Sequence, residues 1–261
     1  MEPEPGRIGV AGDWHGNTVW AVRAVREMAA LLPADAPRVI VQLGDFGIWP
    51  GLGGREFLAR LDAALAGAGA ELWFADGNHE DFTRLARLRP GPDGRARVTG
   101  RIFRLPRGHR WRWHGRTWLA LGGAVSLDRV IRTEGRDWWP GEEITAGQEA
   151  AVIAGGPAEV MVTHDCPAGV THAFPPPPSW WDLADLARSD AHRERLRRVV
   201  TAVRPAHLMH GHLHTGYQRT CDFGYGPVQV TGLDRDDADR GNWAILDART
   251  MTWSFPPHPG A

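Results

Sequence analysis

The chain contains no lysine: all 30 basic residues are arginine, against 31 acidic residues and a formal net charge of -1. Together with abundant alanine, glycine and proline, this fits the codon bias of a GC-rich genome, so the arginine content by itself indicates no function. A protein that binds nucleic acid without sequence preference usually carries a clear basic excess. The charge balance therefore argues against that class of protein.

Cysteine and long apolar runs are also scarce. Two cysteines are too few for a disulfide framework, and no apolar stretch is long enough to span a bilayer. No basic and then apolar leader precedes the first expected strand. With 261 residues and no linker-like stretch, the sequence predicts one soluble domain, residues 1–261, in the cytoplasm.

The sequence does contain five apolar runs that each end in Asp, Asn or His. The five ends are Gly12-Asp13-Trp14-His15-Gly16, Gly44-Asp45, Gly77-Asn78-His79-Glu80, His164-Asp165 and Gly211-His212-Leu213-His214. An apolar run with β-branched residues that stops at such a group predicts a strand that delivers polar side chains to the rim of a sheet. The neighbouring glycines allow the sharp turn that this requires.

The expected elements favour an α/β fold. Helices are predicted at residues 18–32, 55–65 and 81–88, between and after the first three strands, which gives the β-α-β-α-β order typical of parallel sheets with ligands at their carboxyl ends. Short strands are expected at 101–104, 111–113 and 117–121, helices at 144–154 and 191–203, and antiparallel strands at 217–220, 228–231, 243–247 and 252–255. Two inserts lie at about 126–142 and 167–181. Two packed sheets with helices outside are the economical arrangement.

The polar groups at the strand ends are a mixed set of oxygen and nitrogen ligands. The residues are Asp13, His15, Asp45, Asn78, His79, His164, His212 and His214. Carboxylate, amide oxygen and imidazole together suit Mn, Fe, Zn or Ni, and no thiolate is present to select a softer metal. The set is too large for one tetrahedral site and about enough for two metals, the clamp that phosphatases and nucleases use.

In order and in sequence, the five blocks resemble the signature blocks of the calcineurin-like metallophosphoesterases, from the first strand to about His214. The resemblance implies a four-layer α/β/β/α sandwich with a dinuclear site along the sheet edge. It assigns Asp13, His15 and His214 to the first metal, Asn78, His164 and His212 to the second, and Asp45 to both. It places His79 over the scissile phosphate as a catalytic residue rather than a ligand.

Each block alone has an ordinary structural explanation, such as a capped turn or a histidine at a strand end; their joint occurrence favours the metal site. Two features of the Ser/Thr protein phosphatase branch are missing. Asp45 is followed by Phe46-Gly47-Ile48 rather than Asp-Arg-Gly, and Asp76 stands where that branch places arginine. Ile48 also occupies the position of the aspartate that often orients the catalytic histidine, so the sequence names no partner for His79.

The first insert contains Arg132, a candidate phosphate ligand through its planar guanidinium, although a surface arginine explains it equally well. Trp138-Trp139 and Trp180-Trp181 could form an aromatic wall of the site, but anchoring the inserts is the favoured role.

The sequence therefore predicts a phosphoric ester hydrolase in which a metal-bridging hydroxide attacks a phosphodiester, with phosphomonoesters as further substrates. Diesters are favoured because the cations that grip a monoester dianion are missing. The expected cofactors are two divalent ions, Mn²⁺ first and Fe, Zn or Ni as alternatives. Nucleotides and nucleic-acid ends stay open as substrates, and no membrane partner is expected. The alternatives are a Ser/Thr-type protein phosphatase and a non-catalytic scaffold on the same fold.

Overall fold

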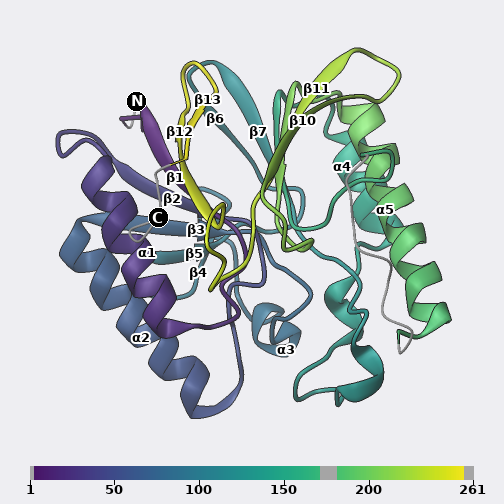
Figure 1. Cartoon of the computed structure of the whole chain (residues 1–261), viewed down its shortest axis with the longest axis horizontal. Coiled ribbons are helices and arrows are strands. Elements are labelled where there is room, and N and C mark those ends of the chain that lie inside the picture. Colours follow the sequence, from purple (N-terminus) through teal and green to yellow (C-terminus); the bar gives the residue numbers. More distant parts are fainter. Residues whose placement is uncertain (1–2, 171–180, 256–261) are drawn as a thin grey trace.

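A computed structural model describes residues 3–170 and 181–255, which form two β-sheets flanked by helices (Figure 1). Within these residues the first sheet has the order β13 (Thr252–Ser254), β12 (Trp243–Asp247), β1 (Arg7–Ala11), β2 (Arg38–Gln42), β3 (Ala70–Phe74), β5 (Ile102–Arg104) and β4 (Ala96–Arg97). The second has the order β10 (Tyr217–Asp222), β11 (Pro227–Gly232), β9 (His207–His210), β8 (Val160–Thr163), β7 (Arg116–Leu121) and β6 (Arg110–Trp113). The expected mixed α/β class and two-sheet arrangement are confirmed.

The longer helices lie on the outer sides of the two sheets (Figure 1). Residues of α1 (Thr18–Leu31) and α2 (Gly51–Ala68) share a buried apolar cluster with the first sheet, and residues of α4 (Ala146–Ala154) and α5 (Leu183–Val203) share one with the second. A third cluster lies between the sheets and includes Val10 and Val41 from one sheet and Trp118 and Val162 from the other. Alternate residues of each strand thus face either the helices or the opposite sheet.

The middle of each sheet is parallel. Strands β1, β2, β3 and β5 run parallel to one another in the first sheet, as do β7, β8, β9 and β11 in the second. The expectation that the strand near 228–231 is antiparallel holds for one of its two pairings: β11 pairs antiparallel with β10 but parallel with β9. The hairpin of β10 and β11 places its second strand next to β9. The carboxyl ends of the parallel strands of each sheet therefore lie along one edge.

Several element boundaries differ from the sequence prediction. Helix α5 begins at Leu183 rather than at residue 191, because the Asp182 side chain caps it by accepting from the backbone N–H of Ala184. Helix α2 begins at Gly51 rather than at 55, and α3 (Phe82–Leu85) is shorter than the predicted 81–88. The insert at 126–142 contains two 3-10 turns, Arg129–Ile131 and Pro140–Glu142.

Of the second predicted insert, 167–181, residues 171–180 lie outside the described part of the chain, and Trp180 lies with them. Among the helices of residues 3–170 and 181–255, none has the length and apolar character needed to cross a membrane.

Candidate metal centre

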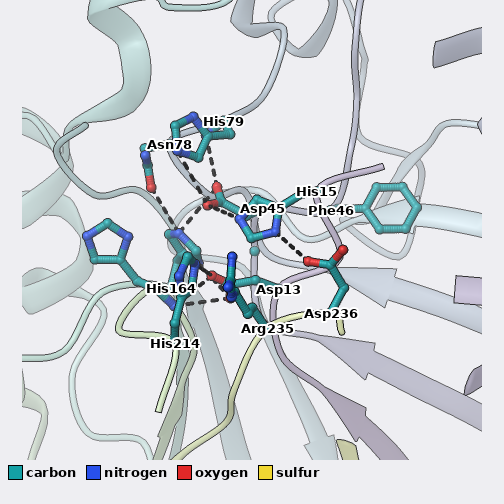
Figure 2. A network of polar contacts seen from close by, with 12 residues as sticks. Asp13, His15, Asp45, Phe46, Asn78, His79, His164, His214, Arg235 and Asp236 are labelled. Atoms are coloured by element: carbon teal, nitrogen blue, oxygen red, sulfur yellow. Dashed lines mark hydrogen bonds and ion pairs between the residues drawn. The ribbon is translucent and has the colours of Figure 1, made fainter. Parts of the chain in front are cut away.

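The polar groups predicted at the strand ends converge on one place in the structure (Figure 2). Asp13 and His15 follow β1, Asp45 follows β2, and Asn78 and His79 follow β3 of the first sheet. His164 follows β8, and His212 and His214 follow β9 of the second sheet. The backbone N–H of His212 donates to the Asp13 carboxylate at 3.1 Å, so the two sheets meet directly at the site.

The metal-ligating atoms form two clusters. One consists of Asp13, His15 and His214, the other of Asp45, His164 and His212, and within each cluster the potential ligand atoms lie within 4.8 Å of one another. This is the division that the family resemblance implies, except that Asp45 was expected to serve both clusters and Asn78 to join the second. Asp45 and Asn78 therefore decide how the two clusters are connected.

Asp45 belongs to the second cluster and also faces the first. Its Oδ2 atom is 3.5 Å from Nε2 of His15, in the first cluster, and its Oδ1 atom is 3.3 Å from Nε2 of His164, in the second. The carboxylate is 1 % exposed, so neither oxygen is occupied by bulk solvent. Each oxygen faces a different cluster, which is the geometry that a bridging carboxylate needs.

The backbone is in the left-handed region at four of these residues. The φ angles are 46° at His15, 50° at Asp45, 63° at His212 and 48° at His214. A side chain in this conformation costs on the order of 1–2 kcal/mol per residue. Residues held in such conformations tend to cluster at functional sites. Here the strain falls on the groups that could hold a cation.

Glycine is required beside two of the candidate ligands, Asn78 and His212, because the loops that carry them lie so close to neighbouring loops. A Cβ atom at Gly77, next to Asn78, would lie 2.1 Å from the backbone nitrogen of Asp45. A Cβ atom at Gly211, next to His212, would lie 2.1 Å from Oδ1 of Asp13. The glycines of the sequence blocks therefore allow the loops from different strands to pack against one another.

The site stabilises positive charge. Burial raises the pKa of Asp13 and Asp45, but the neighbouring histidines outweigh this effect and hold both values below the ordinary range. Burial lowers the pKa of His15, whereas hydrogen bonds to Asp236 and Asp45 raise it, with a net value of about 11. Buried carboxylates that favour a protonated imidazole also favour a metal cation in its place.

The donor atoms of the second cluster fit a cation. Nδ1 of His164 lies 2.8 Å from the carbonyl oxygen of Leu43, and donation of the Nδ1–H to that oxygen leaves the Nε2 lone pair of the neutral ring free. Nε2 faces Oδ1 of Asn78 at 3.0 Å and Oδ1 of Asp45 at 3.3 Å. When Nε2 is unprotonated, these three acceptors repel one another unless a cation takes the place of the proton, so these residues can hold a divalent metal.

His79 and Arg132 lie beside the clusters and line one small cavity with Trp49 and Trp139. Nε2 of His79 is 4.0 Å from Oδ2 of Asp45, and its Nδ1 is buried without a hydrogen-bond partner among the described residues. Trp139 is 8 % exposed and donates to Thr83, so it anchors the first insert as expected.

Arg132 is held by its own insert. Its Nη2 donates to Oδ2 of Asp128 at 2.5 Å, and its Nη1 donates to the carbonyl oxygen of Asp137 at 3.3 Å. Its Nε is buried and has no partner among the residues described. The guanidinium therefore has a fixed position in the cavity that it shares with His79, and its Nε–H is among the donors that have no partner in the described residues.

Sequence reasoning missed three groups that support the site. Asp236 accepts from the ring of His15, Glu80 accepts from the backbone N–H of Phe46 and Ile48, and Ser126 accepts from the amide of Asn78. The only local signal for Asp236 is a run of acidic residues after β11, Asp234, Asp236, Asp237 and Asp239. These contacts join segments far apart in the chain, which spacing does not show.

The family model for calcineurin-like phosphoesterases matches residues 6–216, most of the chain. The chain belongs to the calcineurin-like phosphoesterase family. Membership supports metal-dependent hydrolysis of phosphate esters, because the enzymes of this family use divalent metals. The two residue clusters are groups that could hold such metals.

Similar solved structures are distant. A conserved uncharacterized protein from Streptococcus pneumoniae, described as a predicted phosphoesterase, is 11 % identical with a TM-score of 0.37, over 94 % of this chain and 83 % of that one. A phosphopantetheinyl hydrolase from Mycobacterium tuberculosis is 13 % identical with a TM-score of 0.41, over 88 % of this chain and 91 % of that one. A comparison with curated proteins finds no match. Likeness at this level indicates no substrate.

Proposed function

We propose that this protein is a phosphodiesterase that uses two divalent metal ions, with Mn²⁺ as the preferred ion. The observation that carries the proposal is the position of Asp45, whose two carboxylate oxygens face the two ligand clusters separately. Asp13, His15 and His214 would hold one ion, and Asn78, His164 and His212 the other. Two bound ions would hold the phosphoryl oxygens and lower the pKa of a water molecule.

The chain's own groups complete the chemistry. His79 lies beside Asp45 and would donate a hydrogen bond to the phosphoryl or leaving oxygen, since its side chain borders the clusters but belongs to neither. Arg132 would bind a non-bridging phosphate oxygen through its free Nε–H. Asp128 holds the guanidinium of Arg132 in place for that contact.

The presence of Asp76, where the protein phosphatase branch has an arginine, supports a diester substrate. The carboxylate of Asp76 is saturated by Arg104 and Arg107. The single negative charge of Asp76 offsets one of the two positive charges, and both guanidinium groups also donate to backbone carbonyl oxygens, so neither arginine is available as a phosphate ligand. A diester carries one negative charge and a monoester dianion two, so the diester needs fewer cationic partners.

A groove beside the first cluster could hold one ester group of the substrate. It has about 450 Å³ of accessible space and is lined by His15, Trp49, Phe57 and Arg60 among others. Glycines 16, 47, 53 and 54 line the same groove, so few side chains obstruct it. The indole of Trp49 offers an apolar face for an aromatic or nucleobase group.

The test is metal analysis combined with turnover. The purified protein should bind two Mn²⁺ ions per chain and hydrolyse bis(p-nitrophenyl) phosphate faster than p-nitrophenyl phosphate. Faster hydrolysis of the monoester and of phosphopeptides would instead identify a protein phosphatase. Neither metal binding nor turnover with Mn²⁺, Fe²⁺, Zn²⁺ or Ni²⁺ would identify a non-catalytic scaffold.

A further inference from the structure

The side chain of Asn78 is fixed at both ends of its amide group. It is 2 % exposed, its Nδ2 donates to Oγ of Ser126 at 3.0 Å, and its Oδ1 lies 3.0 Å from Nε2 of His164. The two ends of an amide have the same shape but opposite hydrogen-bonding roles. Only the oxygen end can bind a cation, so the direction of this amide matters for the second cluster.

A buried carboxylate sets that direction. Oε2 of Glu142 accepts from the hydroxyl of Ser126 at 2.5 Å, and Oε1 accepts from the backbone N–H of Ser126 at 3.1 Å. Glu142 is fully buried, and an ionised carboxylate can only accept. The hydroxyl hydrogen of Ser126 is therefore committed to Glu142, and the lone pairs of Oγ are left to accept from Asn78. The amide of Asn78 must then present its oxygen to His164.

We propose that Ser126 and Glu142 are positioning residues that determine which end of the Asn78 amide faces the second cluster. The proposal rests on the two-metal function above. Without this pair the amide can rotate and present its NH₂ group, whose hydrogens repel a cation. Neither residue touches the ion or the substrate, so their effect passes entirely through Asn78.

The insert that carries Glu142 is held in place independently. Arg107 donates to the carbonyl oxygens of Glu142 and Glu143 at 2.7 and 2.6 Å, and its Nε donates to Oδ2 of Asp76 at 2.8 Å. Asp76 lies two residues before Asn78. The loop after β3 and the insert are thus joined twice, once through Arg107 and once through Ser126, and the carboxylate cannot move away from the hydroxyl freely.

The structure allows an isosteric test at Glu142. In Glu142→Gln, the amide oxygen can still accept from the backbone N–H of Ser126, but the new NH₂ group faces Oγ and donates to it. The Ser126 hydroxyl then turns its hydrogen toward Asn78. This reverses the donor and acceptor roles in both hydrogen bonds of Ser126 Oγ, the one to residue 142 and the one to Asn78. This variant should therefore be as damaging as Ser126→Ala, although it changes neither shape nor volume appreciably.

Binding of Mn²⁺ is measured by equilibrium dialysis at about pH 8, where Glu142, whose pKa burial raises to about 7, is mostly ionised. Wild type should bind two ions. Ser126→Ala and Glu142→Gln should each retain the first ion and weaken the second by about tenfold to a hundredfold, the usual effect of losing an outer partner of a ligand. The matched control is Glu143→Gln, because Glu143 pairs with Arg188 and does not contact Ser126. It should bind both ions as wild type does.

Adding Asn78→Asp separates positioning from packing. A carboxylate presents an oxygen in either orientation, so Asn78→Asp should restore the second ion in Ser126→Ala and in Glu142→Gln. The gain in affinity for the second ion that Asn78→Asp produces must be larger in these two variants than in wild type, since the added charge favours metal binding in any background. Thermal unfolding with EDTA identifies any variant that fails to fold.

Three outcomes overturn the inference. The first is wild-type affinity for the second ion in folded Ser126→Ala and Glu142→Gln proteins. The second is a gain from Asn78→Asp that is the same in every background. In both cases the two-metal function survives, because wild type still binds two ions. Wild type that binds fewer than two ions overturns the function and the positioning role together.

Discussion

Nδ1 of His15 lies 2.8 Å from Oδ1 of Asp236, a residue 221 positions later in the chain (Figure 2). The other oxygen of Asp236 accepts from the side-chain amide of Asn17 at 2.9 Å. The carboxylate is thereby fixed and in turn fixes the imidazole, so that Nε2 of His15 points toward Asp45. The family match ends at residue 216, so this contact brings a segment outside the matched region to the candidate metal centre.

Asp236→Asn should weaken binding of the first metal ion by about tenfold to a hundredfold, because an outer carboxylate orients its histidine and raises its basicity. The affinity for the second ion should be unchanged. Equilibrium dialysis at increasing Mn²⁺ concentration measures the affinities for both ions. The matched control is Asp239→Asn, an exposed aspartate of the same loop. Equal loss in the two variants would contradict the orienting role.

His79→Ala should keep both metal ions and lose turnover by about a hundredfold to ten-thousandfold, the range for removal of a group that transfers or shares a proton. The reason is that the imidazole borders the clusters without belonging to either. Metal content and steady-state hydrolysis of a chromogenic diester are measured on the same preparation. His207→Ala, which removes an imidazole from the start of β9, serves as the control. Loss of metal in His79→Ala would instead make His79 a ligand.

Asp76→Asn should lower the free energy of unfolding by about 3 kcal/mol at pH 7, since it removes one partner of a buried ion pair. Burial raises the pKa of Asp76, but Arg107 and Arg104 outweigh it and hold the value below the ordinary range. A lowered folded-state pKa gives stability that is complete above the unfolded value and is lost as the pH falls through the folded one.

The difference between wild type and Asp76→Asn should accordingly be constant from about pH 8 to 5 and narrow below about pH 4. Urea unfolding of the metal-free proteins measures it. Asp93→Asn removes an aspartate–arginine pair at the surface, where Asp93 is about half exposed, and should cost less than about 1 kcal/mol. A gap for Asp76→Asn that persists undiminished at pH 3 would show that the ion pair is not its source.

Trp49→Ala should raise KM for a bis-aryl diester by about tenfold, the equivalent of 1.4 kcal/mol, with a smaller change in kcat. The groove that Trp49 lines together with His15 would lose an aromatic wall. Steady-state kinetics separate the two parameters. Trp253→Ala, in the groove between β13 and β11, should leave both unchanged. An unaltered KM in Trp49→Ala would place the ester group elsewhere.

The candidate ligands could be found from the sequence because each follows directly on an apolar strand. The period of the strand, the glycine and the polar group lie within a few residues, and such local patterns survive without knowledge of the fold. The pairing of distant strands then followed from the β-α-β order. For these reasons the two-sheet α/β class was predictable, whereas the convergence of Asp13 and His214, which follow strands of different sheets, was implied by the family resemblance.

Contacts between distant segments were not predictable. Ser126 meets Asn78 across 48 positions of sequence, and no spacing rule links a serine of an irregular insert to a strand end. The start of α2 was missed for a different reason. Its glycine-rich first turn suggests a loop, yet a Cβ atom at Gly54 would lie 2.0 Å from the carbonyl oxygen of Trp49, so close packing rather than flexibility explains this glycine.

The left-handed backbone at His15, Asp45, His212 and His214 has a consequence for how this chain should be altered. If folding alone chose the residue at each of these positions, glycine would be preferred, because it adopts positive φ without a steric penalty. The side chains found at these four positions are thus maintained at a cost in folding stability. A redesign for thermal stability that ignored the reaction would replace these four residues with glycine, and would produce a more stable but inactive protein.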